Sequence, residues 1–268
     1  MSDTEKGKYS ADAHIAEIYD RIETQTDDVD LIRRLIGDAG PLTIFEPFCG
    51  TGRIAIPLAH DGHRLIALDE SAAMLERMET KLDSEAADLR DRARIIRSGV
   101  FAADWPADVD LVLLGGNCFY EVSSSDEQRA LVFRAASALH PGGHLYIDVD
   151  DHGAVDLSPA WRKPPDEVRP AFPSGTCGDG TVLEGSTQTV WYDVPARIVH
   201  YVRRLDVTHP DGTTSHHEWT ETCHPVVMVE ILAWVHEAGL VVAETFGDSE
   251  GKPYGPDSPR AVVWARRE

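Results

Sequence analysis

The chain has 268 residues, enough for one large domain with an appendage and for a substantial hydrophobic core. Its 46 acidic and 25 basic residues give a formal net charge of −21, with no large cluster of Lys and Arg. Such a charge repels nucleic-acid phosphates and anionic membranes, so we expect no nucleic-acid substrate and no membrane partner.

The four cysteines form no C-x-x-C pair, which indicates free thiols in a reducing compartment. No apolar run approaches the roughly 20 residues of a membrane span, and the first ten residues are polar and charged. We therefore expect a soluble, cytoplasmic protein that acts on a cationic or neutral small molecule. The oligomeric state stays open, with a homodimer as one candidate assembly.

Two helices are predicted at the start of the chain. Apolar residues recur at i, i+3, i+4 and i+7 between residues 11 and 22, with Tyr19 among them. A second helix is predicted over residues 28–36, before a glycine. We expect residues 1–40 to form a helical cap on the rest of the protein.

Residues 43–53 predict a strand, a glycine loop and the start of a helix, with Glu46 at the end of the strand. Gly50 and Gly52 allow a ligand to approach the backbone closely and allow a turn that other residues reach only with strain. A dinucleotide fingerprint would need a third glycine where Ala55 stands, and a P-loop would need Gly-Lys-Ser/Thr. The loop therefore has neither of the usual phosphate-binding forms.

A second strand, predicted over residues 64–69, ends on Asp69. A carboxylate at this position, about 20 residues after the glycine loop, can accept two hydrogen bonds from a ribose diol. Ser71 can cap the following helix, whose buried face includes Met74. The loop and the strand-end carboxylate together predict a nucleoside-binding site.

These motifs resemble class I S-adenosylmethionine-dependent methyltransferases of the small-molecule type. The family's first motif is an acidic residue, a spacer and G-C-G-T-G, here Glu46 to Gly52 with Phe48 in place of the first glycine, and LDESAAML resembles the family's D-x-S-x-x-M-L. The resemblance implies an α/β, Rossmann-like sheet of seven mostly parallel strands with helices on both faces. It also implies S-adenosyl-L-methionine as cofactor, and it spans nearly all of residues 45–266.

The resemblance assigns cofactor contacts residue by residue. The family's G-T-G-R places a cation, here Arg53, against the methionine carboxylate, and a Tyr-Asp pair like the one at Tyr19 lies near the methionine end and the substrate. The third predicted strand ends in Val100, where the family often carries an Asp for adenine, so we expect adenine to contact backbone groups and Phe101, or Asp104. The expected cofactor-binding residues are Tyr19, Glu46, Gly50, Gly52, Arg53, Asp69, Ser71, Met74, Val100, Phe101 and Asn117.

A continuous apolar run over residues 109–114 predicts a strand buried on both faces, followed by Asn117. The carboxyl end of such a strand is where ligands bind in open α/β sheets. The segment that ends at Tyr120 distantly resembles the N-P-P-Y of amino-group DNA methyltransferases, but both prolines are absent. We therefore place Asn117 on the cofactor side.

The strand predicted over residues 144–149 ends in an acidic group that includes Asp148 and Asp150, followed by His152. Carboxylates and an imidazole can collect a cationic amine, orient it or take its proton. His152, Asp150 and Tyr19 are therefore our candidate catalytic residues. A solvated acidic loop is the alternative interpretation.

Composition changes over residues 153–224, between the first part of the core at 41–152 and a final helix and two strands at 225–268. Proline- and glycine-rich residues over 158–180 predict a loop, and alternating segments with hairpin signals follow. We expect an inserted antiparallel sheet beside the substrate.

His216, His217 and Glu218 resemble a set of metal ligands. Adjacent residues of a strand point to opposite faces, so these three side chains cannot converge without a bulge. We therefore expect no metal site.

The sequence as a whole predicts a methyltransferase that acts on a small molecule. We favour N-methylation of an amine-bearing metabolite or natural-product intermediate, because the pocket side is acidic and the layout resembles amino-sugar and small-amine N-methyltransferases. An O-methyltransferase is one alternative. A protein of this fold that binds the cofactor without transferring the methyl group is another.

Overall fold

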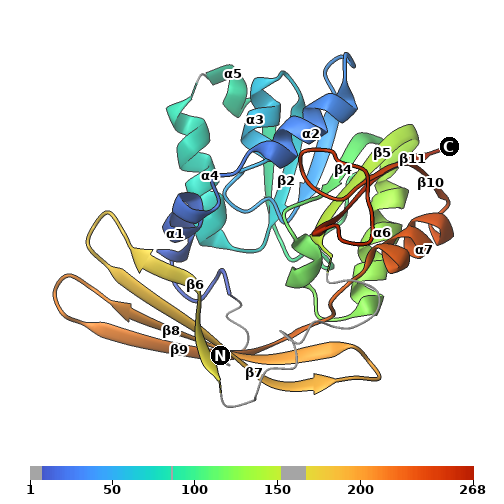
Figure 1. The fold of residues 1–268 in the computed structure, drawn as a ribbon. Coiled ribbons are helices and arrows are strands. Elements are labelled where there is room, and N and C mark those ends of the chain that lie inside the picture. The colour runs from blue at the N-terminus through green and yellow to red at the C-terminus, as the bar shows by residue number, and fades with distance from the viewer. Residues whose placement is uncertain (1–7, 86, 152–166) are drawn as a thin grey trace.

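A seven-stranded sheet forms the core of the protein in the computed structural model, which describes residues 8–85, 87–151 and 167–268 (Figure 1). The strand order is β10-β11-β5-β4-β1-β2-β3. Strands β1 to β5 pair in parallel, and β11 pairs antiparallel with both β5 and β10. The strands are β1 (Thr43–Pro47), β2 (Arg64–Asp69), β3 (Ala93–Arg97), β4 (Val109–Leu114), β5 (Leu139–Asp150), β10 (Leu240–Phe246) and β11 (Arg260–Arg267). The predicted mostly parallel Rossmann-like sheet is confirmed.

Helices cover both faces of this sheet because successive side chains of a strand point to opposite faces. On β1, Phe45 belongs to a hydrophobic cluster with α6 and α7, whereas Ile44 belongs to a second cluster with α2, α3 and α4. The helices are α2 (Asp27–Ile36), α3 (Ala55–His60), α4 (Ala72–Ser84), α5 (Ala87–Arg90), α6 (Ser125–Ala138) and α7 (Met228–Glu237), with a 3-10 turn, η1 (Cys118–Glu121), after β4. Among the described residues, no helix has the length and apolarity needed to cross a membrane.

A separate four-stranded antiparallel sheet lies beside the core, in the order β6-β7-β8-β9 (Figure 1). Its strands are β6 (Val168–Thr176), β7 (Val182–Asp193), β8 (Ile198–Thr208) and β9 (Thr214–Cys223). Helix α1 (Ile15–Ile22) packs between this sheet and α4, and Ile15, Met74 and Leu205 share one hydrophobic cluster there. The inserted sheet therefore meets the core through the N-terminal helix.

The prediction of a loop over residues 158–180 is wrong for β6. This strand contains Pro170 and Pro173 and is interrupted by a bulge between Ala171 and Ser174. Proline is tolerated in edge strands and at bulges, where no ladder hydrogen bond is lost. The proline-rich composition therefore marked the edge of the sheet.

The end of β5 is fastened to the start of β11 by a buried ion pair. Asp148 is 1% exposed, and Arg260 Nε donates to its Oδ1 at 2.6 Å. Arg260 also donates through Nη1 to Asp150 Oδ1 at 2.7 Å. Burial raises the pKa of Asp148, while the positive charge of Arg260 opposes that rise.

We predict that Arg260→Met destabilises the protein by about 3–5 kcal/mol at neutral pH, because the buried Asp148 carboxylate loses its counter-charge. Protonation of Asp148 relieves this cost, so the loss of stability should be smaller at about pH 5 than at about pH 8. Denaturant titrations at the two pH values measure the free energy of unfolding of the variant and of the parent. Arg129→Met is the matched control, because Arg129 pairs with Glu237 at a half-exposed site and its loss should cost less than about 1 kcal/mol. An equal loss in the two variants would contradict the assignment.

Candidate active site

The glycine loop between β1 and α3 is built from residues with left-handed backbone. Phe48, Gly50 and Gly52 have φ values of 65°, 54° and 81°. A Cβ on Gly52 would lie 2.9 Å from Ile56 and 3.0 Å from Met78, so only glycine lets the helices pack this closely. No atom lies within 4 Å of a Cβ placed on Gly50, so a ligand can approach the backbone there. Phe48 takes the left-handed conformation at the position where the resemblance expects glycine.

Asp69 connects the end of β2 to this loop and to α4. Its Oδ2 accepts a hydrogen bond from the Gly50 N–H and its Oδ1 accepts one from the Ser71 N–H, both at 2.9 Å. Ser71 caps α4 by accepting from the Met74 N–H at 3.4 Å, and its hydroxyl donates to the Tyr9 carbonyl at 2.8 Å. Burial raises the pKa of Asp69, and the two backbone donors oppose the rise. Each carboxylate oxygen keeps capacity for a further hydrogen bond.

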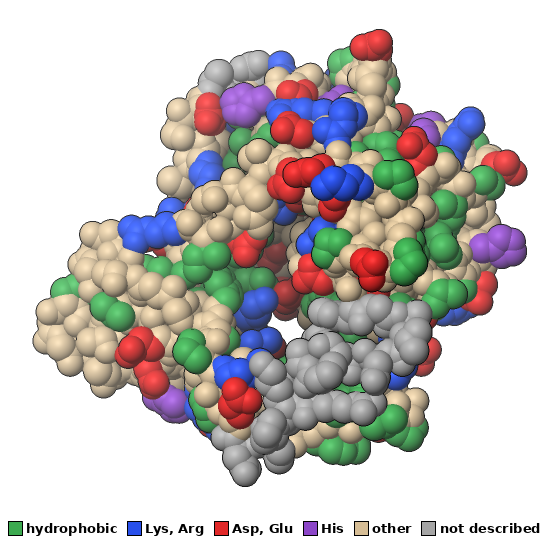
Figure 2. All heavy atoms as spheres, viewed as in Figure 1, with side chains coloured by type: hydrophobic (Ala, Val, Ile, Leu, Met, Phe, Trp, Pro, Cys, Tyr) green, Lys and Arg blue, Asp and Glu red, His purple; other side chains and the backbone are tan. Residues whose placement is uncertain are grey.

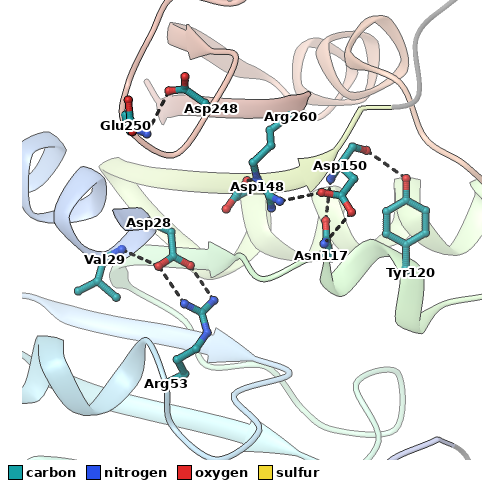
Figure 3. Close-up of polar contacts among 10 residues, drawn as sticks. All are labelled: Asp28, Val29, Arg53, Asn117, Tyr120, Asp148, Asp150, Asp248, Glu250 and Arg260. Atoms are coloured by element: carbon teal, nitrogen blue, oxygen red, sulfur yellow. Dashed lines mark hydrogen bonds and ion pairs between the residues drawn. The ribbon is translucent and has the colours of Figure 1, made fainter. Parts of the chain in front are cut away.

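Arg53 and Glu46 lie behind the loop with opposite charges. Arg53 donates to Asp28 Oδ1 at 2.9 Å and to Asp28 Oδ2 at 2.6 Å (Figure 3). Its Nε is buried and has no hydrogen-bond partner among the described residues, and the same holds for Oε2 of the buried Glu46. Burial raises the pKa of Glu46 to about 8, against the opposing charge of Arg53. No motif in the sequence marks Asp28, which gives Arg53 an internal carboxylate partner.

These unpartnered groups fit the predicted cofactor. S-adenosylmethionine carries an ammonium and a carboxylate at its amino-acid end, which match the free Oε2 of Glu46 and the free Nε of Arg53. The remaining acceptor capacity of Asp69 suits a ribose diol. The predicted residues of the loop and of β2 therefore come together with complementary chemistry.

Helix α1 is tied to the glycine loop by Asp20. Its Oδ1 accepts from the Thr51 hydroxyl at 2.6 Å and from Lys81 Nζ at 2.7 Å, and Lys81 also donates to the Thr51 carbonyl at 2.9 Å. The neighbouring Tyr19 lies beside Arg53: burial raises the pKa of Tyr19, and the charge of Arg53 opposes the rise. The structure therefore places Tyr19 beside the glycine loop, and its contact with the cofactor or the substrate stays a prediction.

Val100 and Phe101 lie after β3. Val100 is buried, and its carbonyl accepts from Trp105 Nε1 at 2.8 Å and from Arg134 Nη1 at 3.0 Å. The Phe101 ring is 36% exposed and lies 5.5 Å from the Arg134 guanidinium. These contacts fix the segment, and contact of either residue with adenine stays a prediction.

Asn117 lies at the end of β4 and is bonded to the end of β5 (Figure 3). Its Oδ1 accepts from the Asp150 N–H at 2.6 Å and its Nδ2 donates to Asp150 Oδ2 at 3.1 Å. The Asp150 carboxylate also accepts a hydrogen bond from Arg260. The Asp150 carbonyl accepts one from the Tyr120 hydroxyl at 3.1 Å. The acidic exit of β5 is therefore a braced network rather than a solvated loop. His152 lies outside the described residues, so its catalytic role stays a prediction, as does that of Asp150.

A second set of side chains, missed by sequence analysis, gathers beside Tyr19. The ring centroids of Tyr9 and Phe172 lie 5.8 Å apart, and the ring of Tyr19 is nearly perpendicular to both, with centroid distances of 6.1 Å and 6.3 Å. Lys8 Nζ lies 4.6 Å from the Tyr9 ring, 5.4 Å from the Phe172 ring and 3.5 Å from Glu121 Oε1. These residues come from the N-terminal segment, η1 and β6, and no local sequence pattern connects them.

Comparisons with known proteins agree with this architecture. Residues 44–143 match a family model described as a methyltransferase domain, and this stretch contains the glycine loop and Asp69. A curated relative, the cypemycin N-terminal methyltransferase of Streptomyces sp, is 24% identical over 231 residues, covering 84% of this chain and 83% of that protein.

Two solved structures share the fold over nearly the whole chain. An S-adenosylmethionine-dependent methyltransferase from Clostridium acetobutylicum matches with a TM-score of 0.73 and 14% identity, covering 94% of this chain and 97% of that one. A sugar N-methyltransferase from Streptoalloteichus sp matches with a TM-score of 0.67 and 18% identity, covering 94% and 92%. At these identities the likenesses show the fold alone.

We predict that Asp69→Ala weakens S-adenosylmethionine binding at least about tenfold, because hydrogen bonds to a charged acceptor contribute roughly 1.5–3 kcal/mol each. Loss of the carboxylate also frees the N–H groups of Gly50 and Ser71, which should loosen the loop. Titration calorimetry measures the affinity. Glu70→Ala, which removes the adjacent exposed carboxylate, is the control and should bind as the parent does. Unchanged affinity in Asp69→Ala would refute the assignment.

We predict that S-adenosylmethionine affinity rises with pH from about 5.5 to about 7, because Glu46, with a pKa of about 8 beside Arg53, Asp28 and Asp69, must ionise to bind an ammonium. In this range the ionised fraction grows about tenfold per pH unit. Calorimetry in two buffers of different ionisation enthalpy should detect proton release on binding. In Glu46→Gln the release should disappear; if it persists, another group titrates.

Proposed function

We propose that this protein, an S-adenosylmethionine-dependent methyltransferase, transfers the methyl group to the nitrogen of a small amine-bearing molecule. The cofactor, when bound, supplies a methyl group on a cationic sulfur, which is open to in-line attack. The tasks left to the chain are to align the acceptor and to exclude water. We assign the alignment of the acceptor to the aromatic and carboxylate side chains that gather beside Tyr19.

The observation that carries this proposal is the position of the Lys8 ammonium. It lies over the faces of Tyr9 and Phe172 and beside the carboxylate of Glu121. Ring faces attract cations, and a carboxylate completes a site with the chemistry of an ammonium receptor. We infer that a substrate amine takes the place of the Lys8 ammonium.

The position of the Lys8 ammonium adjoins the residues that we assign to the cofactor. The Tyr9 carbonyl accepts a hydrogen bond from the Ser71 hydroxyl. Burial raises the pKa of the Tyr9 side chain, and the nearby negative charges of Glu121 and Asp69 add to this rise. A bound amine would therefore lie between Glu121 and the groups we assign to the cofactor.

Glu121 suits the proton chemistry of an amine acceptor. An ammonium must lose its proton before the nitrogen can attack, and a hydrogen-bonded carboxylate is a positioned acceptor for that proton. The Glu121 side chain is 28% exposed, so the proton can pass on to water. The braced carboxylates Asp148 and Asp150, already paired with Arg260, are less suited to this task.

The comparisons support nitrogen as the target and a small molecule as the acceptor class. Two matched proteins are described as an N-terminal methyltransferase and a sugar N-methyltransferase. The net charge of −21 disfavours a nucleic-acid substrate. All four cysteines are buried free thiols, which suits a reducing compartment, and we place the reaction in the cytoplasm.

The test is a screen of primary and secondary amines, each with its hydroxyl analogue, for formation of S-adenosylhomocysteine. We predict turnover with amines and a roughly tenfold higher KM for the amine in Glu121→Gln, because the ammonium loses a charged partner. Cofactor affinity should not change. Asp126→Asn, an exposed carboxylate on the following helix, is the control. Turnover of alcohols alone, or a parental KM in Glu121→Gln, would overturn the proposal.

A further inference from the structure

The face of the inserted sheet that packs on α1 continues beyond that contact as a polar surface. Leu205 of β8 belongs to the hydrophobic cluster with α1, and Arg203, two residues before it, lies on the same face. The strand register places Arg169 of β6 opposite Thr187 of β7, and Thr187 opposite Arg203. These three residues form one row across the sheet, and Thr189 follows Thr187 on the same face.

Hydrogen-bonding groups in this row are buried without partners. Within residues 8–85, 87–151 and 167–268, no partner exists for Nε of Arg169, Oγ1 of Thr187 or Oγ1 of Thr189. Thr187 is 9% exposed and Thr189 is 4% exposed. Burying a polar group without a partner is costly, and native structures rarely do so without a reason. The row therefore has the character of a surface built to receive a polar ligand.

The sign of the charge in this row indicates which class of ligand the row would bind. Arg203 donates through Nε to Glu221 Oε2 at 3.0 Å, so this arginine is neutralised. Arg169 forms no ion pair with any part of the chain that the structure describes, which leaves one positive charge in surplus among the described residues of the row. In a chain with a net charge of −21, this local surplus favours an anion. A guanidinium presents N–H groups in a fork that matches a carboxylate.

This row continues toward the proposed amine site through Tyr201, which the strand register places opposite Thr189. Burial raises the pKa of Tyr201, and the nearby charges of Arg203 and Arg169 oppose the rise. Tyr201 in turn lies near enough to Tyr120 of η1, next to Glu121 in the chain, to contribute to the raised pKa of Tyr120, which burial mainly causes. Figure 2 shows a hollow between the core and the inserted sheet, with basic and acidic side chains on its walls. Tyr201 thus connects the row with the residues beside Glu121.

We propose that Arg169, Thr187 and Thr189 form a subsite for a carboxylate of the acceptor, so that the acceptor is an amino carboxylate whose amine faces Glu121. The amine half of this statement rests on the proposed function. The carboxylate subsite rests on the inserted sheet alone, so the two can fail separately.

The test measures the thermal unfolding midpoint of the full chain against rising concentrations of amine-free carboxylates (acetate, propionate and succinate) at constant ionic strength, with chloride as reference and inorganic phosphate as a second arm. The variants are Arg169→Met, Arg169→Lys and the control Arg204→Met. Arg204 lies on the opposite face of β8, where it pairs with Glu218, so its loss removes a charge from the sheet without touching the row.

We expect a saturable rise of the midpoint with carboxylate in the parent and in Arg204→Met. In Arg169→Met the same rise should need at least about tenfold more carboxylate, and Arg169→Lys should be weakened because it loses the fork. Without added carboxylate, Arg169→Met should unfold at or above the parental midpoint, because it removes an unpaired cation.

Absence of a saturable rise in the parent, an unchanged response in Arg169→Met and Arg169→Lys, or a response to phosphate alone would each overturn the subsite. A lower midpoint of carboxylate-free Arg169→Met would count against it, since that result marks Arg169 as a structural residue. If carboxylates stabilise the parent through Arg169 and no amine is methylated, the subsite stands and the proposed function fails.

Discussion

The carboxylate of Asp69 is the interaction on which the geometry of the site depends. It holds the N–H groups of Gly50 and Ser71, and so joins the end of β2 to the glycine loop of β1 and to the first turn of α4. Ser71 passes this constraint on to the N-terminal segment through the carbonyl of Tyr9. The ring of Tyr9 then packs on Phe172 of the inserted sheet. One half-buried carboxylate thus links the core, the cap and the sheet.

The charged groups of the site lie in separate places, and each place has its own chemistry. Glu46 and Arg53 keep opposite, incompletely bonded groups behind the loop, which suits a zwitterionic amino-acid end. Away from the loop, Glu121 lies in η1 of the core and Arg169 in β6 of the inserted sheet. The burial of Glu46 and Arg53 costs stability, because charged groups lose hydration when they leave water. Their presence indicates that the interior is adapted to charged ligands rather than to maximal stability.

Local sequence patterns predicted the parts of the fold that local physics determines. The continuous apolar run of β4 and the strand ending at Asp69 have the predicted bounds, because short apolar runs of this length are typical of strands inside a parallel sheet. The strand β6 was missed because Pro170 and Pro173 are acceptable only at an edge, and edge position is a property of the whole sheet. The pairing of Asp148 with Arg260 joins residues over one hundred positions apart, so the acidic exit looked free in the sequence. The aromatic and carboxylate groups beside Lys8 were missed for the same reason.

The central claim is that the methyl group is delivered toward the rings of Tyr9 and Phe172 and the carboxylate of Glu121. A crystal structure with S-adenosylhomocysteine tests it most directly. The account predicts the ribose on Asp69, the amino-acid end between Glu46 and Arg53, and the sulfur directed at Glu121 with room between them for one methyl group and one nitrogen. A sulfur atom that points away from this group, with Glu121 and the two rings screened from it by protein, would contradict the account.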